Sequence, residues 1–480
     1  MLALPALSGN RGIQKTRHSG FRKRERYYSM GLSRNQRRPN AMNELALDLN
    51  QKIRAASPAA YEMLSALGKR IYFPSKGILS QSAEAKTLGK RFNATIGTAL
   101  EDGAPMHLPC VTDMLDGIPL KEALLYAPSS GKPALRQAWR EKLLHDNPSL
   151  KDVAFSLPVV TNGLTHALAV AADMFLDAGD RVVLPDLNWD NYLLNMTDRV
   201  GADLHFYPLF DNGRFNTRGL AAELAAVPVG EKVFTVLNFP NNPTGYTPLE
   251  EEGEAIAAAL LAAAERGVKV VALVDDAYYG LFYDARCMKQ SLFTKIAGKH
   301  ANLMAIKADA ATKECYVWGL RVGFIAFAIG TSADAEATAA LYKALEQKAA
   351  GLIRSTVSNC SALSQYIATQ ALTSKEFYSQ RQAKSDVMRA RCEAVAQTLA
   401  AHPEYGAYFT AHPFNSGYFM CLRLHKTSSE TLRRLLLDKY QTGGIAIGER
   451  DFRIAFSCLE LSQIPELFQA IWSACKELAG

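Results

Sequence analysis

The chain has 480 residues, 48% of them hydrophobic and 21% charged, an ordinary globular composition with ample material for a large core. Its longest small apolar run, Ile256–Ala264, is too short to cross a bilayer, so we expect no membrane contact. The net charge of +7 comes from residues 1–41, where ten Lys and Arg against Glu25 alone give +9. Residues 42–480 thus carry about −2, which argues against nucleic acid as a partner.

The first 41 residues lack apolar periodicity, so we expect them to be a disordered basic extension. Three interpretations stay open: an Arg-rich transit peptide, a nucleic-acid-binding arm, or upstream sequence without a role, with Met30 or Met42 as the working start. None of the eight cysteines forms a CxxC pair, which argues against a zinc site or a redox dithiol. Scattered single cysteines fit a reducing compartment, so we expect a cytoplasmic protein, or an organellar-matrix protein if the extension is a transit peptide.

From Ser156 onward, predicted strands alternate with predicted helices. Residues 156–163 read as a strand that ends in a turn, and apolar residues at helical spacing then predict a helix that Gly179 closes. A second helix is predicted over 248–266, before Gly267. Further short β-branched runs occupy 180–186, 232–245, 268–280, 301–310 and 321–330. This alternation predicts an α/β fold with a mainly parallel sheet and helices on both faces.

Polar clusters follow five of these predicted strands. In open α/β sheets the ligand site lies beyond the carboxyl ends of the strands, so five clusters at five strand ends predict one shared site. The clusters are TNGLTH (161–166), PDLNWDNY (185–192), NFPNNPTG (238–245), DDAYYG (275–280) and KADAATK (307–313).

The side chains in these clusters suit one cofactor. A lysine can form a Schiff base with an aldehyde, a carboxylate can hold a protonated ring nitrogen, and an aromatic side chain can stack on a ring. A glycine turn that opens a helix can bind a phosphate, and an arginine can clamp it. Together they describe a pocket for pyridoxal 5′-phosphate (PLP).

Three motifs in order then carry a family resemblance. NNPTG (241–245), DDAYYG (275–280) and Thr312-Lys313 followed by GLRVGF (319–324) resemble the fold-type I PLP-dependent aminotransferases of class I and II, most of all their aspartate aminotransferase branch. The likeness extends from about Asn93 to Ser457. It implies a large PLP-binding domain over 108–385 and a smaller α/β domain made from both chain ends, 42–107 and 386–480.

The resemblance also implies cofactor-binding residues. Lys313 matches the catalytic Schiff-base lysine, with Arg321 eight residues later as the phosphate arginine. Asp275 matches the catalytic carboxylate at the ring nitrogen, and Asp276 is expected to face the other side of the strand. The remaining matches are Tyr278 (also catalytic) and Asn242 at the phenolic oxygen, Trp189 as the stacking aromatic, Gly163, Leu164 and Thr165 as the phosphate turn, and Tyr126 reaching the phosphate from a second subunit.

Four positions match substrate-binding residues of the family. Arg453 corresponds to the arginine that grips the α-carboxylate, and Gly97 and Asn242 lie near that group in relatives. Arg354, ahead of Ser358-Asn359, resembles the arginine that pairs with the distal carboxylate of aspartate or glutamate. No metal ligand is expected.

Two departures from the family pattern concern the cofactor. Ala310 stands where relatives often have a phosphate-binding serine, and Tyr192 stands where the aspartate branch has a histidine behind the ring carboxylate. Lys307, six residues before Lys313, is expected to be a structural or surface lysine.

The resemblance implies a homodimeric transaminase of amino acid metabolism. Its expected partners are an L-amino acid, acidic or aromatic by preference, and a 2-oxo acid, which exchange an amino group in a ping-pong cycle. Two alternatives stay open: a PLP-dependent lyase on the same scaffold, and a non-catalytic PLP-binding regulator.

Overall fold

The computed structural model describes residues 42–480, apart from 73–76 and 333. The expectations for the basic extension therefore concern residues outside this part of the chain. Across the part described, no helix combines the length and the apolarity that a membrane crossing needs.

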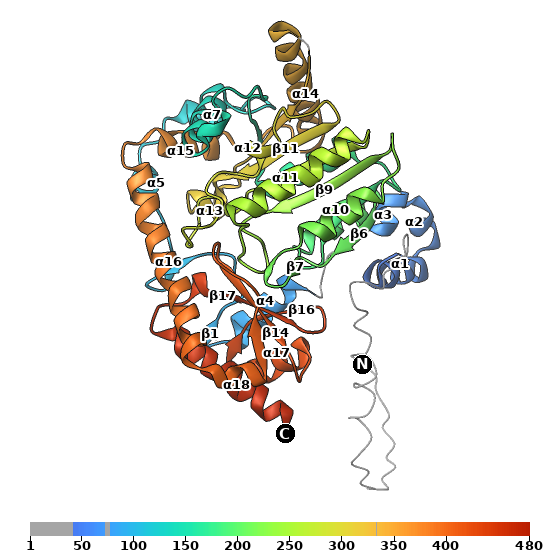
Figure 1. Cartoon of the computed structure of the whole chain (residues 1–480). Coiled ribbons are helices and arrows are strands. Elements are labelled where there is room, and N and C mark those ends of the chain that lie inside the picture. The colour runs from blue at the N-terminus through green and yellow to red at the C-terminus, as the bar shows by residue number, and fades with distance from the viewer. Residues whose placement is uncertain (1–41, 73–76, 333) are drawn as a thin grey trace, which may run out of the picture.

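A seven-stranded sheet forms the centre of the molecule, in the order β4-β12-β11-β10-β9-β5-β6 (Figure 1). All neighbours are parallel except β12, which runs antiparallel to both β11 and β4. The predicted α/β class with a mainly parallel sheet is confirmed. The strands are β4 (Val159–Thr161), β5 (Arg181–Pro185), β6 (Asp203–Tyr207), β9 (Lys232–Asn238), β10 (Lys269–Asp275), β11 (Leu303–Ala310) and β12 (Gly323–Ile329).

Helices cover this sheet with their apolar stripes. In α8 (Leu164–Phe175) the buried residues recur at helical spacing, and the helix packs on β11 and β12. Helices α10 (Thr217–Ala225) and α11 (Glu250–Glu265) lie side by side in front of the sheet in Figure 1. α11 lies within the predicted helix 248–266. β4 is shorter than the predicted strand 156–163, because Pro158 has no N–H to donate.

A second, four-stranded antiparallel sheet lies below the first in Figure 1, in the order β13-β14-β17-β16. It comprises β13 (Phe409–Ala411), β14 (Phe419–Leu424), β16 (Ile445–Ile447) and β17 (Asp451–Ala455), with α17 (Ser429–Asp438) and α18 (Gln463–Ala479) beside it. β1 (Phe92–Asn93) pairs in parallel with β15 (Thr442–Gly443), so a segment that precedes the large sheet in sequence joins the C-terminal part of the chain here.

The long helix α16 (Phe377–Ala401) joins the two sheets along one side of the molecule (Figure 1). Residue 385, the predicted end of the large domain, lies inside this continuous helix. The secondary structure has no break at the predicted boundary at residue 385. The domain boundaries stay a prediction.

The remaining elements surround these two sheets. The helices are α1 (Glu44–Ala56), α2 (Pro58–Met63), α3 (Ala66–Arg70), α4 (Ile78–Leu88), α5 (Pro109–Thr112), α6 (Leu120–Leu124), α7 (Pro133–Asp146), α9 (Asn191–Leu193), α12 (Phe293–Ile296), α13 (Ala311–Glu314), α14 (Ala335–Thr356) and α15 (Ala362–Thr373). The short strands are β2 (Leu100–Glu101), β3 (Ala104–Pro105), β7 (Phe210–Asp211) and β8 (Arg214–Phe215). Tighter or wider helical turns are η3 (Pro148–Leu150), η4 (Leu194–Val200), η5 (Trp318–Leu320), η6 (Pro403–Ala407) and η7 (Phe456–Cys458).

Candidate active site

One pocket at the carboxyl ends of the strands receives side chains from all five predicted clusters. The clusters come together because parallel strands deliver their ends to the same edge of the sheet, and the shared ligand site stays a prediction. The lining residues are Leu164, Trp189, Tyr192, Asn238, Asn242, Asp275, Ala277, Tyr278 and Lys313.

Asp275, the last residue of β10, is a buried carboxylate with two hydrogen-bond donors. The Tyr192 hydroxyl donates to Oδ2 at 2.5 Å, and the Ala277 backbone N–H donates to Oδ1 at 3.0 Å. Burial raises the pKa of Asp275 from 3.8 to about 6, against the lowering effect of the Tyr192 hydrogen bond. Tyr192 thus supports the carboxylate in the place where the aspartate branch has histidine.

Lys313 follows the end of β11, on the short helix α13, and faces the same pocket. Its Nζ lies 4.7 Å from the ring centre of Tyr278. The pKa of Lys313 is lowered to about 8, mainly by burial and to a smaller extent by the charge of Arg321, against the raising effect of Asp275. A lysine with this pKa is partly neutral near neutral pH, so it can act as a nucleophile and as a base.

The turn at Gly163 and the side chain of Arg321 form a cradle at the start of α8. Gly163 has a φ of +78°, and a Cβ there would lie 2.2 Å from Nη2 of Arg321, so only glycine fits. No side chain caps the helix, whose N-terminal amides and dipole favour an anion. The other two predicted turn residues differ in burial: Leu164 is buried and lines the pocket, whereas Thr165 is exposed.

Arg453 is a buried guanidinium on β17, only 2% exposed. Nη1 donates to Oδ1 of Asn242 at 2.9 Å, and Nη2 donates to the carbonyl of Thr95 at 3.1 Å, while Nε has no partner. No carboxylate in the described part of the chain forms an ion pair with it, and burial lowers its pKa. A buried arginine without a counter-ion is a natural receptor for a carboxylate ligand.

The other predicted residues of this pocket surround Lys313 and Arg453. Asn242 lines the pocket and also contacts Arg453, so it links the two. Trp189 lies edge-on to Tyr192, with ring centres 5.8 Å apart. Gly97 lies two residues beyond Thr95, whose carbonyl accepts from Arg453.

Tyr126 and Arg354 do not line this pocket. Tyr126 is 92% exposed, and Arg354 is exposed at the end of α14, where it donates to the Ser358 hydroxyl at 2.5 Å. The two segments adjoin each other, since the Ser129 hydroxyl donates to the Ser358 carbonyl. The structure thus exposes both residues on neighbouring segments outside the pocket.

Lys307 is buried, so the surface alternative for it is wrong. Its Nζ contacts Asp276 and lies 3.0 Å from Oδ1 of Asp309. Asp276, which also accepts from the Ser291 hydroxyl, binds this lysine and is absent from the pocket lining. Lys307 is therefore a structural counter-ion.

Two residues near the pocket escaped the sequence reasoning. The Asn238 side chain donates to the carbonyl of Asp275 at 3.0 Å, so it joins the ends of β9 and β10. Its Oδ1 accepts from the backbone N–H of Asn242. The available signal was its place as the first residue of the polar cluster 238–245. Phe419, whose ring lies 4.2 Å beneath the guanidinium of Arg453, carries no such signal because it comes from the other sheet.

Comparisons with known proteins agree with this geometry. Residues 119–471 match the family "Aminotransferase class I and II", which covers most of the chain, and the chain belongs to this family. Among curated relatives, a probable aspartate/prephenate aminotransferase of Aquifex aeolicus is 31% identical over 207 residues. That match covers 42% of this chain and 48% of the relative, so the chain spans about half the length of the curated relatives it matches.

Solved structures show the same fold over more of the chain. An aminotransferase from Anaerococcus prevotii has a TM-score of 0.73 at 21% identity and covers 86% of this chain and 98% of its own. Aspartate aminotransferase from Thermus thermophilus, solved with maleate, has a TM-score of 0.67 at 18% identity and covers 86% and 99%. At these identities the likeness identifies the fold-type I aminotransferase architecture.

Proposed function

We propose that the chain is a PLP-dependent aminotransferase that exchanges an amino group between an L-amino acid and a 2-oxo acid. One observation carries the proposal: Asn242 joins the pocket of Lys313 and Asp275 to a buried arginine that has no counter-ion. A nucleophilic amine, a carboxylate and a carboxylate receptor around one pocket are what amino-acid chemistry on PLP requires.

The residues present fit PLP. Arg321 and the start of α8 form an anion cradle that a Cβ at position 163 would fill, which suits the phosphate. Asp275 lies deep in the pocket, where it suits a protonated ring nitrogen, and Trp189 supplies an aromatic wall. Tyr278 and Asn242 offer a hydroxyl and an amide to the phenolic oxygen. Cys315, two residues after Lys313, is buried with its thiol pKa raised, which supports Lys313 as the nucleophile.

When bound, PLP supplies an aldehyde that condenses with amines and a pyridine ring that accepts electrons from the amino-acid Cα. Lys313 holds the cofactor, yields to the amino acid, and then takes a proton from Cα as a partly neutral amine. Asp275 keeps a negative charge at the ring nitrogen, with Tyr192 and the Ala277 amide holding its orientation. Arg453 grips the α-carboxylate and so orients Cα toward Lys313.

We further propose that the preferred amino donors are acidic amino acids, followed by aromatic ones. Arg354 would then bind the distal carboxylate of aspartate or glutamate. The Aquifex relative is named an aspartate/prephenate enzyme, and the Thermus structure holds the dicarboxylate maleate. Arg354 lies outside the pocket of the chain to which it belongs. This role therefore requires that Arg354 reach the pocket of a second copy of the chain. A homodimer is supported by Tyr126 and by the apolar side chains before it, Leu120, Leu124 and Leu125, which are 66–74% exposed.

The decisive experiment is covalent trapping. Purified protein loaded with PLP is reduced with borohydride and digested, and we expect the adduct on the peptide that contains Lys313. Lys313→Ala should lose the adduct and the activity, while Lys343→Ala, an exposed lysine on α14, should keep both. An adduct of unchanged yield in Lys313→Ala would refute the assignment. Turnover of an amino acid without any 2-oxo acid would favour the lyase alternative instead.

A further inference from the structure

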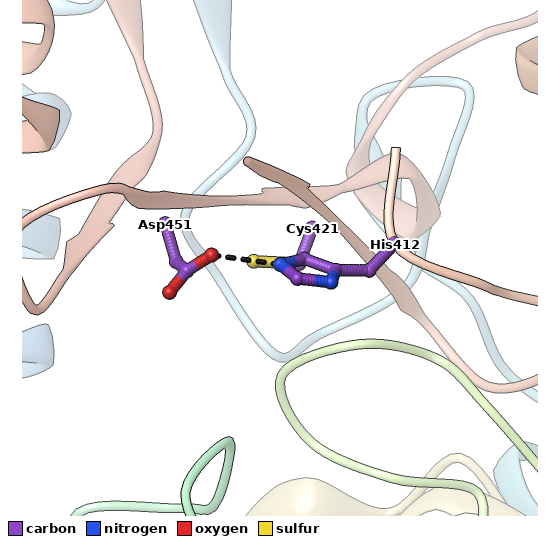
Figure 2. A group of neighbouring side chains, drawn as sticks. All are labelled: His412, Cys421 and Asp451. Atoms are coloured by element: carbon purple, nitrogen blue, oxygen red, sulfur yellow. Dashed lines mark hydrogen bonds and ion pairs between the residues drawn. The ribbon is translucent and has the colours of Figure 1, made fainter. Parts of the chain in front are cut away.

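Three side chains with metal-binding atoms meet on the smaller sheet, and none of them belongs to the lining of the pocket. His412 follows β13, Cys421 lies on β14 and Asp451 begins β17 (Figure 2). One ligand atom from each lies within 4.8 Å of the other two. Residue spacing along the chain carried no sign of this group, because each member comes from a different strand.

The sheet itself holds these positions together. The His412 backbone N–H donates to the Cys421 carbonyl at 2.9 Å. On the neighbouring pair of strands, Cys421 lies opposite Arg453 and Arg423 lies opposite Asp451. Residues two apart on a strand point to the same side, so Cys421, Arg423, Asp451 and Arg453 share one face of the sheet. The cluster is therefore built on a rigid framework.

The ligand atoms are largely removed from water. The side chain of His412 is 14% exposed and that of Asp451 is 12% exposed, and Cys421 is fully buried. An imidazole, a thiol and a carboxylate are the ligand types that Zn²⁺ prefers, whereas Mg²⁺ and Ca²⁺ take oxygen ligands. Three protein ligands leave a fourth, tetrahedral position for water.

One cation already contacts this cluster. Arg423 donates to Oδ1 of Asp451 at 2.8 Å through Nε and to Oδ2 at 3.1 Å through Nη2. His412 Nε2 lies 2.7 Å from the same Oδ1 of Asp451, within hydrogen-bond distance. The Arg423 side chain is 44% exposed, so it can turn outward into solvent and leave the carboxylate to another cation.

We propose that His412, Cys421 and Asp451 form a binding site for Zn²⁺ or a similar borderline-soft divalent cation, which competes with Arg423 for Asp451. The Cys421 thiol gives its proton to solvent on binding, and His412 Nε2 gives up the proton that it shares with Asp451. Arg423 thereby sets the affinity of the site, since its guanidinium occupies the carboxylate whenever the metal is absent.

The test is metal uptake by the full-length, PLP-loaded protein. Equilibrium dialysis against Zn²⁺ should give one tightly bound ion per chain, and Co²⁺ should add visible absorption typical of a thiolate-bound four-coordinate ion. Cys421→Ser and His412→Gln should each weaken binding by at least about tenfold. Arg423→Gln should tighten it, because the competing cation is gone while all three ligands remain.

Matched controls separate this site from other buried thiols. Cys475→Ser removes a buried cysteine of α18 that lies outside the cluster, and it should bind Zn²⁺ like the wild type. Thermal unfolding of each variant identifies any that fail to fold, and Arg423→Gln tests the site with every ligand intact. Equal uptake by wild type and Cys421→Ser would overturn the site. Binding that Arg423→Gln leaves unchanged would overturn the proposed competition.

Discussion

Replacement of Asp275 by asparagine should stabilise the cofactor-free protein while it removes activity. The pKa of Asp275 is raised by burial from 3.8 to about 6, so the folded protein holds this proton more tightly than the unfolded chain. Stability therefore falls as pH rises from about 4 to about 6 and stays lower above that range. The total loss is about 3 kcal/mol above pH 7, and roughly half of it develops between pH 5 and pH 8.

Asparagine has no such titration. It keeps an oxygen for the Ala277 amide, and its amide group can donate to the Tyr192 hydroxyl. Urea unfolding of cofactor-free wild type and Asp275→Asn at pH 5 and pH 8 measures the effect. We expect the free energy of unfolding of the variant to rise relative to that of the wild type by about 1 kcal/mol from pH 5 to pH 8.

Tyr192→Phe provides the opposite control. The Tyr192 hydrogen bond lowers the pKa of Asp275, so its loss raises that pKa further and extends the fall in stability to higher pH. Parallel pH profiles for wild type and Asp275→Asn would show that the carboxylate is solvated, and the reasoning from burial would fail.

Three other substitutions test the binding groups. Arg453→Lys should lower kcat/KM by about a hundredfold, because lysine keeps the charge but loses the paired guanidinium donors; an unchanged kcat/KM would remove Arg453 from substrate binding. Gly163→Ala should weaken PLP binding by about tenfold in a fluorescence titration, because its Cβ displaces Arg321, whereas Gly213→Ala, at a similar positive φ with nothing nearby, should not. Arg354→Ala should lower kcat/KM for aspartate at least about tenfold and spare phenylalanine, and equal losses on both would refute its role as side-chain reader.

The sequence predicted the position of a site residue best where that residue lies at the end of a clearly β-branched run. Asp275 closes a β-branched run, and Lys313 follows the end of another, so strand periodicity by itself placed both at one edge of the sheet. The glycine turn before an apolar helix was visible as a local pattern, but the choice of Gly163 as phosphate turn, and of Lys313 over Lys307, rested on the family resemblance. At these three positions the strand end or turn expected from the sequence is the one that the structure shows.

The antiparallel direction of β12 was not predictable, since a buried β-branched run reads alike in both directions. The cluster of His412, Cys421 and Asp451 was hidden for another reason. Its members meet only through the pairing of β13, β14 and β17, and sequence reasoning fixes the register of such strands poorly.

The consecutive carboxylates Asp275 and Asp276 show how the fold separates two groups that the sequence leaves alike. Both are buried, and each would raise the pKa of the other, because like charges at short range disfavour ionisation. Strand alternation sends them to opposite faces. On the far face, the buried ammonium of Lys307 compensates Asp276 and Asp309, so its charge limits the repulsion that reaches Asp275.

On the near face, Asp275 accepts from neutral donors, and within the described part of the chain no cationic side chain forms an ion pair with it. The Lys313 ammonium acts on it only at longer range and loses its own charge near pH 8. The carboxylate in the pocket is thus left with room for one more positive charge, which is the electrostatic condition for holding a protonated ring nitrogen. Lys307, six residues before Lys313, contributes to that condition and is absent from the pocket lining.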